Sequence, residues 1–406
     1  MTGKVPRTVL LIGTLDTKGE EYQCARERCE AAGLKTIMMD AGVMGSHEIK
    51  TEFSNEEVAK AAGSSISELR SKGDRGYAVS VMTTGAVAIT TKLHQKREID
   101  GIFALGGSGG SAIASAAMRA LPIGFPKVLV STLVGQNADA YVGQSDIALF
   151  ASVVDIAGIN RISSTIIANA VDAMIGMTTS EKTEAKNQKK IIAASMFGVT
   201  TTCVTNARKI LESNGYEVVT FHMTGTGGKA MEKLINDGLV DAVLDVTTTE
   251  LCDEIVGGTL SAGPERLSAA AQKKIPQVVS LGALDMVNFG SVGSVPAEFK
   301  NRNLYIHNAN VTLMRTTPEE CKKIALDICH KLAQSSAPTA VIVPLRGISA
   351  IATAGQPFHD PEADAALFTT LRENLPKHVE LIELDLAIND SEFSSALAAK
   401  LLSFLR

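Results

Sequence analysis

Residues 100–120 read DGIFALGGSGGSAIASAAMRA, and this stretch contains a complete strand–turn–helix unit. The apolar run Gly101–Leu105 predicts a strand buried on both faces, because a half-exposed strand would alternate apolar and polar residues. Four glycines within Gly106–Ser111 predict a turn, and the alanine-rich stretch Ala112–Ala120 predicts a helix. A buried strand that leads through a glycine turn into a helix is typical of a parallel sheet.

The same alternation recurs along the chain, with helical patterns between most of the apolar runs. We therefore expect the α/β class, with two Rossmann-like parallel-sheet domains of three α/β/α layers each. The predicted strands are Thr8–Ile12, Lys35–Met39, Gly101–Leu105, Lys127–Val130, Ile191–Met196, Glu217–Phe221, Asp241–Val246, Gln277–Leu281, Asn303–Ile306, Thr339–Val343 and Val379–Leu384.

Two domains follow from the length of the chain. It has 406 residues, and a single hydrophobic core rarely extends beyond about 250–300 residues. The polar and charged stretch 178–190 interrupts the alternation and is interpreted as the linker. We place an N-terminal domain with extra helices at 1–183 and a C-terminal domain at 190–406. Strand and turn motifs recur in the same order in both halves, so a duplicated unit is our hypothesis.

Composition narrows the range of functions. The chain has 39 Lys and Arg against 44 Asp and Glu, a net charge of −5, which argues against a nucleic-acid partner. It has no Trp, which argues against stacking platforms for bases. No apolar run is long enough for a transmembrane helix, so no membrane partner is expected. The six cysteines form no CxxC motif and are interpreted as structural thiols of a protein in the reducing cytoplasm.

Ligands of parallel sheets bind at the carboxyl ends of the strands, so the loops there are the candidate sites. After the first strand, Asp16 and Thr17 are good helix N-caps. Lys18 at a helix start would be explained by a bound anion, although an exposed lysine on a capped helix is an equal alternative. A helix N-terminus preceded by glycines offers free N–H donors to a phosphate or carboxylate, although the glycines could instead serve packing. The second candidate loop of this kind consists of Gly106, Gly107, Ser108, Gly109 and Gly110.

A further glycine loop follows the strand at Glu217–Phe221, and both loops satisfy the dinucleotide pattern GxGxxA. This third loop contains Thr224, Gly225, Thr226, Gly227 and Gly228. Asp245 lies twenty residues beyond Gly225, the place of a ribose-binding acid in NAD proteins. Thr247 and Thr248 follow it and could donate to phosphate or hold Mg²⁺ through water, or simply cap the next helix.

Three residues near the C-terminus are weak catalytic candidates. His359 and Asp360 could act as a general base or metal group, although Asp360 before Pro361 is also typical of a helix start. Arg346 could bind a phosphate or carboxylate with two hydrogen bonds, or form a structural ion pair.

Several motifs together resemble the Tm-one-like ATP-binding proteins. They are Gly13-Thr-Leu-Asp-Thr-Lys-Gly-Glu20, the glycine loop at 106–110, His222-Met-Thr-Gly-Thr-Gly-Gly-Lys229, Asp245-Val-Thr-Thr-Thr-Glu250, and Pro344-Leu-Arg-Gly347 through Pro357-Phe-His-Asp-Pro361. The resemblance runs from end to end. It implies two Rossmann-like subdomains, ATP bound with Mg²⁺, and a homodimer. Plant and many fungal members continue into a C-terminal barrel, which we expect this chain to lack.

The leading hypothesis is a nucleotide-binding protein that holds the phosphates of ATP on its glycine loops in an inter-domain cleft. Such a protein could be an enzyme acting on a small phosphorylated or carboxylated metabolite. Two alternatives stay open: an NAD(P)-dependent oxidoreductase that uses the GxGxxA loops, and a non-catalytic regulatory or interaction protein.

Overall fold

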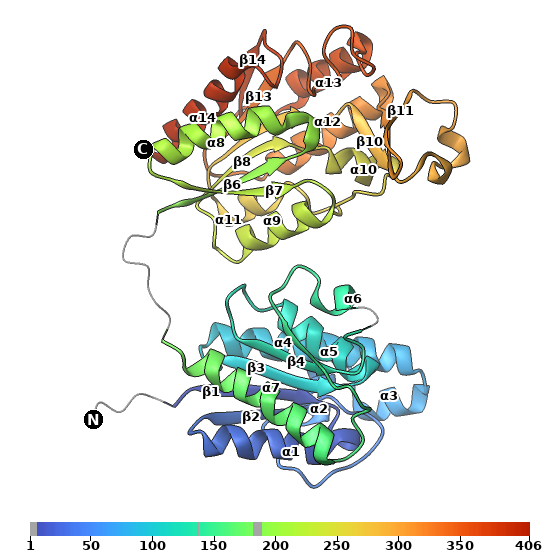
Figure 1. Ribbon diagram of the computed structural model, residues 1–406, viewed down its shortest axis with the longest axis vertical. Helices are drawn as coiled ribbons and strands as arrows, with labels where there is room; N and C mark the ends of the chain where they lie inside the picture. Colours follow the sequence, from blue (N-terminus) through green and yellow to red (C-terminus); the bar gives the residue numbers. More distant parts are fainter. Residues whose placement is uncertain (1–5, 136–137, 182–188) are drawn as a thin grey trace. The chain divides into compact units, whose positions relative to one another are not determined.

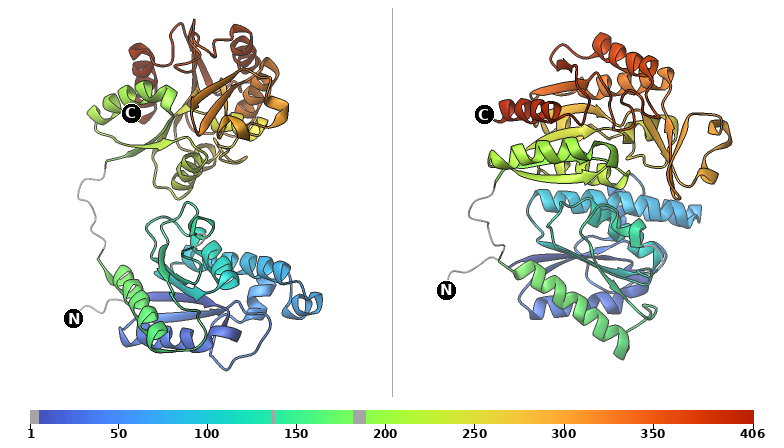
Figure 2. Two further views of the ribbon diagram at one scale, coloured as in Figure 1. Left: turned by 45° about the vertical axis from the view of Figure 1, so that its right-hand side comes forward. Right: turned by 45° about the horizontal axis from the view of Figure 1, so that its top comes forward.

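The computed structural model describes residues 6–135, 138–181 and 189–406, and the chain divides into two compact units, Met1–Glu184 and Ala185–Arg406. Each unit has a parallel sheet between two layers of helices, which confirms the predicted class (Figures 1 and 2). Most of the predicted linker 178–190 falls on 182–188, outside the described residues, and its first residues continue a helix of the N-terminal unit.

The N-terminal unit has a five-stranded parallel sheet in the order β2-β1-β3-β4-β5. Its strands are β1 Thr8–Gly13, β2 Lys35–Asp40, β3 Gly101–Gly106, β4 Lys127–Ser131 and β5 Ala148–Ala151. Its helices are α1 Leu15–Ala31, α2 Asn55–Ala61, α3 Ile66–Lys72, α4 Arg75–Gln95, α5 Ser108–Arg119, α6 Ala138–Val142 and α7 Arg161–Thr179.

Side chains of β3 show why the strands of this unit are continuously apolar. Phe103 and Leu105 pack with α1 and α7 on one face of the sheet, and Ile102 and Ala104 pack with helices α2 to α5 on the other. All six residues of β3 are buried. Because successive side chains of a strand point to opposite faces, a strand covered on both faces needs an apolar residue at every position.

The C-terminal unit has a six-stranded parallel sheet in the order β14-β13-β9-β8-β6-β7. Its strands are β6 Ile191–Met196, β7 Glu217–His222, β8 Ala242–Thr247, β9 Gln277–Gly282, β13 Thr339–Pro344 and β14 Glu380–Leu384. Its helices are α8 Thr201–Ser213, α9 Thr226–Asn236, α10 Glu250–Val256, α11 Ala269–Lys273, α12 Pro318–Leu332, α13 Pro361–Asn374 and α14 Ser391–Leu405, with short 3₁₀ turns η1 Gly198–Thr200, η2 Val292–Ser294 and η3 Ala297–Phe299.

The two parallel sheets share one topology. Read in the matching direction, β7-β6-β8-β9-β13 takes the order of β2-β1-β3-β4-β5. The first strand of each unit therefore lies between the second and the third, which agrees with the duplicated unit inferred from the sequence. The chain reverses direction across the sheet at this point, and ligands of open α/β sheets bind there.

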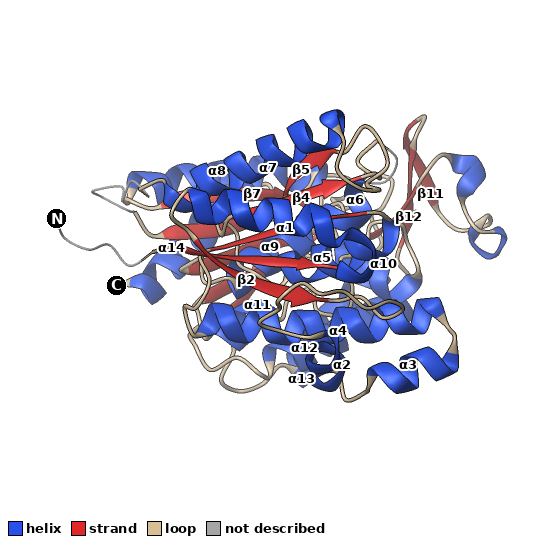
Figure 3. Ribbon diagram, turned by 90° about the horizontal axis from the view of Figure 1, so that it is seen from below, coloured by secondary structure: helices blue, strands red, loops and turns tan. Residues whose placement is uncertain are grey.

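A separate three-stranded sheet belongs to the C-terminal unit alone. It consists of β10 Met286–Phe289, β11 Leu304–Asn308 and β12 Val311–Arg315 in the order β10-β12-β11, and β11 and β12 stand at one end of that unit (Figure 3). Its strands are antiparallel, so the strand predicted at Asn303–Ile306 is real but does not belong to the parallel sheet. Neither β10 nor β12 was predicted.

Candidate functional site

A cavity of about 570 Å³ lies at the carboxyl ends of the strands in the N-terminal unit. Its walls come from the loops after β1, β2 and β3 and from helices α3 and α4, so it occupies the point where the chain changes direction across the sheet. Two loops singled out in the sequence meet here, since the cavity is lined by Asp16, Thr17 and Lys18 and by the Gly107–Gly110 segment.

The glycine loop after β3 presents a helix N-terminus to this cavity. Helix α5 begins at Ser108, and Gly107 is its N-cap, which has no side chain to bond the first turn. The first N–H groups of a helix have no acceptor within the helix. The amides of Ser108, Gly109 and Gly110 are therefore available to an anion, which the helix dipole also favours.

The packing of the protein does not require glycine at most of this loop. A Cβ built on Gly107, Gly109 or Gly110 would meet nothing closer than 3.8 Å. Only at Gly106 is the space tight, with Gly110 Cα 3.3 Å away. Glycine at three of these four positions leaves room beside the amides, as a bound group that contacts the backbone would need.

Two arginines that the sequence reasoning missed line the same cavity. The Arg75 guanidinium reaches toward the loop, with Nη2 3.9 Å from a Cβ built on Gly109. Among the described residues it has no ion pair and no hydrogen bond. The guanidinium of Arg70 is engaged, because it donates to the carbonyls of Val43 and Gly45. An unpaired cation therefore lies beside open amides in this cavity.

The loop after β1 differs from its prediction in detail. Helix α1 begins at Leu15 with Thr14 at the N-cap, so Asp16 and Thr17 are not caps. Asp16 Oδ2 instead accepts the amides of Met44 and Gly45 at 3.0 and 3.1 Å. Its buried Oδ1 has no partner among the described residues. Asp16 thus fixes the wall formed by the β2 loop and keeps one oxygen unused.

The Lys18 side chain is bonded within the protein. Its Nζ donates a hydrogen bond to the Ile156 carbonyl, and its backbone departs from helical angles (φ −135°, ψ 29°), so α1 is kinked there. Lys18 still lines the cavity. The cation free to meet a ligand is Arg75 rather than the lysine that the sequence suggested.

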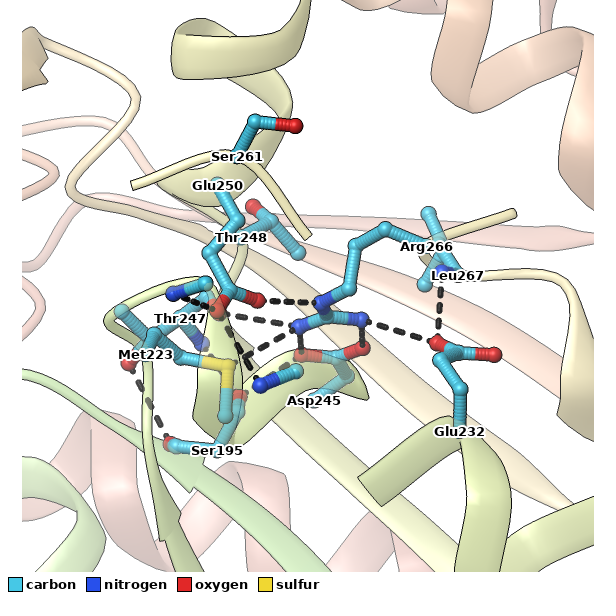
Figure 4. Close-up of polar contacts among 12 residues, drawn as sticks. Ser195, Met223, Glu232, Asp245, Thr247, Thr248, Glu250, Ser261, Arg266 and Leu267 are labelled. Carbon is cyan, nitrogen blue, oxygen red and sulfur yellow. Dashed lines mark hydrogen bonds and ion pairs between the residues drawn. The ribbon is translucent and has the colours of Figure 1, made fainter. Parts of the chain in front are cut away.

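The third candidate loop, residues 224–228, is filled by a carboxylate of the protein itself (Figure 4). Glu250 is fully buried at the start of α10, and its Oε1 accepts the amides of Gly225 at 2.7 Å and Gly228 at 3.1 Å. A Cβ on Gly228 would lie 1.9 Å from Glu250 Oε2, and a Cβ on Gly227 would lie 1.8 Å from the His222 carbonyl. These two glycines are required by packing.

Asp245 belongs to the same buried network. Both its oxygens accept from the fully buried Arg266, at 2.6 and 2.7 Å, and Ser195 donates to Oδ1 at 2.6 Å. Arg266 Nε also donates to Glu250 Oε2 at 2.8 Å. The Asp245 carboxylate, which the sequence suggested for a ribose, is therefore already bonded within the unit. Burial raises the pKa of Glu232, the third acid on this guanidinium.

The threonines around this network divide into two groups. Thr247 and Thr248 are buried, and their hydroxyls bond Thr200 and the Ser280 carbonyl. Neither has the exposed hydroxyl that a phosphate or hydrated Mg²⁺ would need. Thr224 and Thr226 are less buried and lie 3.3 Å from one another through their hydroxyl oxygens.

The three weak catalytic candidates do not form one group. Arg346 and His359 both line a cavity of about 600 Å³ at the carboxyl ends of β13 and β14. Asp360 is the N-cap of α13, and its Oδ1 accepts the Ala363 amide at 3.0 Å, as the helix-start interpretation predicts.

Two further features bear on cofactors and membranes. Within residues 6–135, 138–181 and 189–406, no cluster of three or more His, Cys, Asp or Glu side chains could hold a metal ion. In the same ranges no helix combines the length and apolar character needed to cross a membrane.

Comparison with known proteins gives two family matches. The models of the N-terminal and C-terminal domains of uncharacterised protein family UPF0261 match residues 7–183 and 189–405. A UPF0261 protein of Clostridium tetani is 52% identical over 98% of this chain and 99% of its own length. The UPF0261 protein RA0729 of Rhizobium meliloti is 42% identical over 97% and 98%.

Tomato relatives match as well, which confirms the predicted resemblance to Tm-1-like proteins. The ToMV resistance protein Tm-1(GCR237) of Solanum lycopersicum is 42% identical over 80% of this chain but 44% of its own length. The expectation about a missing C-terminal barrel stays a prediction. A UDP-GlcNAc 2-epimerase of Methanocaldococcus jannaschii aligns over 68% of this chain and 83% of its own with 9% identity and a TM-score of 0.22, too weak to argue from.

Proposed function

The chain belongs to uncharacterised protein family UPF0261, and we propose that its N-terminal unit binds a nucleotide, ATP with Mg²⁺, in the cavity of the β1, β2 and β3 loops. One observation carries the proposal. The N-terminus of α5 is open to that cavity and lies beside Arg75, a cation that has no partner among the described residues.

The residues present fit this ligand. Phosphate oxygens accept hydrogen bonds from helix-terminal amides and from guanidinium groups, which the Ser108–Gly110 amides and Arg75 would supply. Mg²⁺ is held in proteins by one or two carboxylates together with substrate phosphates. The absence of a three-residue metal cluster in the described residues is compatible with that arrangement, and the unused Oδ1 of Asp16 would be the protein ligand.

The rest of the cavity suits a nucleoside. Part of its wall is apolar and is formed by the side chains of Leu69, Ala78, Val79, Met82 and Ile113. An apolar wall with polar groups at one end is typical of small-molecule sites. The same cavity could present the nucleotide to a small metabolite, which would make the protein an enzyme.

The contacts of Asp245, near the third candidate loop, favour ATP over NAD(P). A dinucleotide needs an acid for its ribose, and the Asp245 carboxylate is already bonded by Arg266 and Ser195. In the first half, Lys127 stands twenty residues after Gly107, and it is buried against Asp146.

A titration of the whole chain tests the proposal. We expect ATP with Mg²⁺ to bind, measured by calorimetry and by a rise in the unfolding temperature, and NAD⁺ and NADPH to leave both unchanged. Gly109→Asp should abolish ATP binding, because the new carboxylate would pair with Arg75 and occupy the anion position. Gly176→Asp is the matched control, since this exposed glycine of α7 also has open space around it. Unaltered affinity in the Gly109→Asp variant would refute the site.

A further inference from the structure

The C-terminal unit has a cavity that the nucleotide proposal does not use. It measures about 600 Å³ and lies at the carboxyl ends of β13 and β14, beside the N-terminal ends of α13 and α14. This size falls in the range of small-molecule sites. Its polar side chains are Arg346, Thr353, His359, Asp364 and Asp390.

Arg346 holds most of its donors unused. Its guanidinium is 62% exposed and makes only long contacts with Asp385, at 3.5 Å to the carbonyl and 3.9 Å to the carboxylate. Its backbone is fixed, because its amide donates to the Leu386 carbonyl at 3.0 Å. A guanidinium on a fixed backbone with free donors is suited to bind a carboxylate.

The cavity also has acceptor atoms without a partner in the described ranges. Asp390 Oδ2 accepts the Ala387 amide at 2.8 Å, and Asp364 Oδ1 accepts from Arg315 at 2.6 Å. In the described part of the chain, the second oxygen of each carboxylate has no hydrogen-bond partner. His359 Nδ1 lies 3.3 Å from the Ala352 carbonyl, to which it can only donate, and its Nε2 has no partner among the described residues.

Two hydrogen bonds link the backbone of Arg346 to the Asp390 carboxylate. Arg346 bonds Leu386 through its backbone, and the next residue, Ala387, bonds the Asp390 carboxylate. The remaining lining is apolar and includes Leu345 after β13 and the side chains of Ala365 and Phe368 on α13. A ligand that satisfies all these groups needs an anion, a donor-rich cation next to it, and an apolar body.

We propose that this cavity binds an α-amino acid, with its carboxylate on Arg346, its ammonium on Asp390 and its side chain toward Ala365 and Phe368. The site is separate from the nucleotide cavity, and its ligand is recognised independently of ATP. It gives the chain a second small-molecule site, in the unit whose glycine loop is filled by Glu250.

Screening of the standard L-amino acids against the whole chain tests this. We expect at least one to raise the unfolding temperature and to bind in calorimetry. Its analogues without the amine or without the carboxylate (for leucine, isocaproate and isoamylamine) should each bind about tenfold more weakly or worse. Absence of binding by every amino acid, or equal binding by the analogue without the amine, would overturn the proposal.

Variants assign the contacts. Arg346→Gln and Asp390→Asn should each weaken the amino acid about tenfold or more and leave ATP binding unchanged. Asn at position 390 can still accept the Ala387 amide, so this variant should fold. Arg208→Gln, an exposed α8 arginine paired with Glu212, is the control and should bind as the unaltered chain does. Unaltered affinity in the Arg346→Gln variant would show that the carboxylate does not lie there.

Discussion

Alanine at Gly228 and alanine at Gly109 should have opposite effects on stability, although both glycines occupy a GxGxxA loop. A Cβ at Gly228 would stand 1.9 Å from Glu250 Oε2, whereas a Cβ at Gly109 would meet nothing closer than 3.8 Å. Both positions are in the first turn of a helix, where alanine is favoured over glycine by up to about 1 kcal/mol. The difference between them therefore measures the clash with Glu250.

The size of that clash follows from how Glu250 is held. Its carboxylate is fully buried and accepts from Gly225, Gly228 and Arg266 at 2.7, 3.1 and 2.8 Å. Moving it away from the new methyl group breaks some of these bonds, and hydrogen bonds to a charged group contribute roughly 1.5–3 kcal/mol each. Losing two of them, less the gain in helix propensity, gives a destabilisation of about 3 kcal/mol for Gly228→Ala. Gly109→Ala should lie between 0 and about 1 kcal/mol of stabilisation.

Scanning calorimetry and urea unfolding give the measurement. For a unit of this size, about 3 kcal/mol lowers the unfolding temperature by roughly 6–12 °C. Hydrogen exchange should locate the loss in α9, α10 and the Arg266 loop. In a Glu250→Ala background the same Gly228→Ala change should add almost nothing, because the obstructing carboxylate is gone. A Gly228→Ala variant within 1 kcal/mol of the unaltered chain would refute the reasoning, as would an equal loss in both backgrounds.

Three further changes should have measurable effects. Arg266→Met leaves three buried acids without their cation and should destabilise the chain by about 3–5 kcal/mol in urea unfolding. The loss of stability should be larger at pH 8 than at pH 5. An unchanged free energy of unfolding would mean that the network is dispensable. Burial raises the pKa of Asp253 to about 7 from 3.8, so the folded state keeps a proton that the unfolded state releases between these pH values. The contribution of Asp253 to stability therefore falls as pH rises from about 4 to about 7, by about 4 kcal/mol in total. Asp253→Asn should make this slope shallower by up to about 1.4 kcal/mol per pH unit, and an unchanged slope in urea titrations would contradict the assignment. Arg75→Gln should weaken ATP about tenfold or more in calorimetry without altering the unfolding temperature, whereas Arg161→Gln, another exposed arginine of the same unit, should change neither quantity.

Buried strands were predictable from sequence because a strand covered on both faces must be apolar throughout. The prediction Ile191–Met196 matches β6 residue for residue, and the run Gly101–Leu105 falls one residue short of β3. The missed strands are four or five residues long, and β10 and β12 pair antiparallel outside the main sheet. Short segments of this kind have no extended apolar run to distinguish them from loops.

The candidate site was predictable only in part, for a reason that the two glycine loops make clear. The sequence predicted the amides at Gly107–Gly110, because glycines between a strand and a helix indicate a turn and a helix N-terminus from neighbouring residues alone. It did not locate Arg75, which reaches the loop only because α4 packs on that face of the sheet. Nor did it predict that Glu250 would bond the amides of the third candidate loop, or that Arg266 would pair with Glu250, because only the fold brings these residues together.

The two units thus share one sheet topology but differ in what their strand-end loops bond. The strands β3 and β8 hold equivalent places in their sheets, and each is followed by a helix whose first turn faces the carboxyl edge. In the N-terminal unit that turn consists of glycines and serine, so its donors stay open. In the C-terminal unit its first residue is Glu250, which bonds the α9 amides and brings Arg266 with it. A carboxylate supplied by the chain occupies the α9 amides, whereas the α5 amides of the N-terminal unit stay open. For the C-terminal unit, the cavity at β13 and β14 is then the place where a small molecule can still meet unused polar groups.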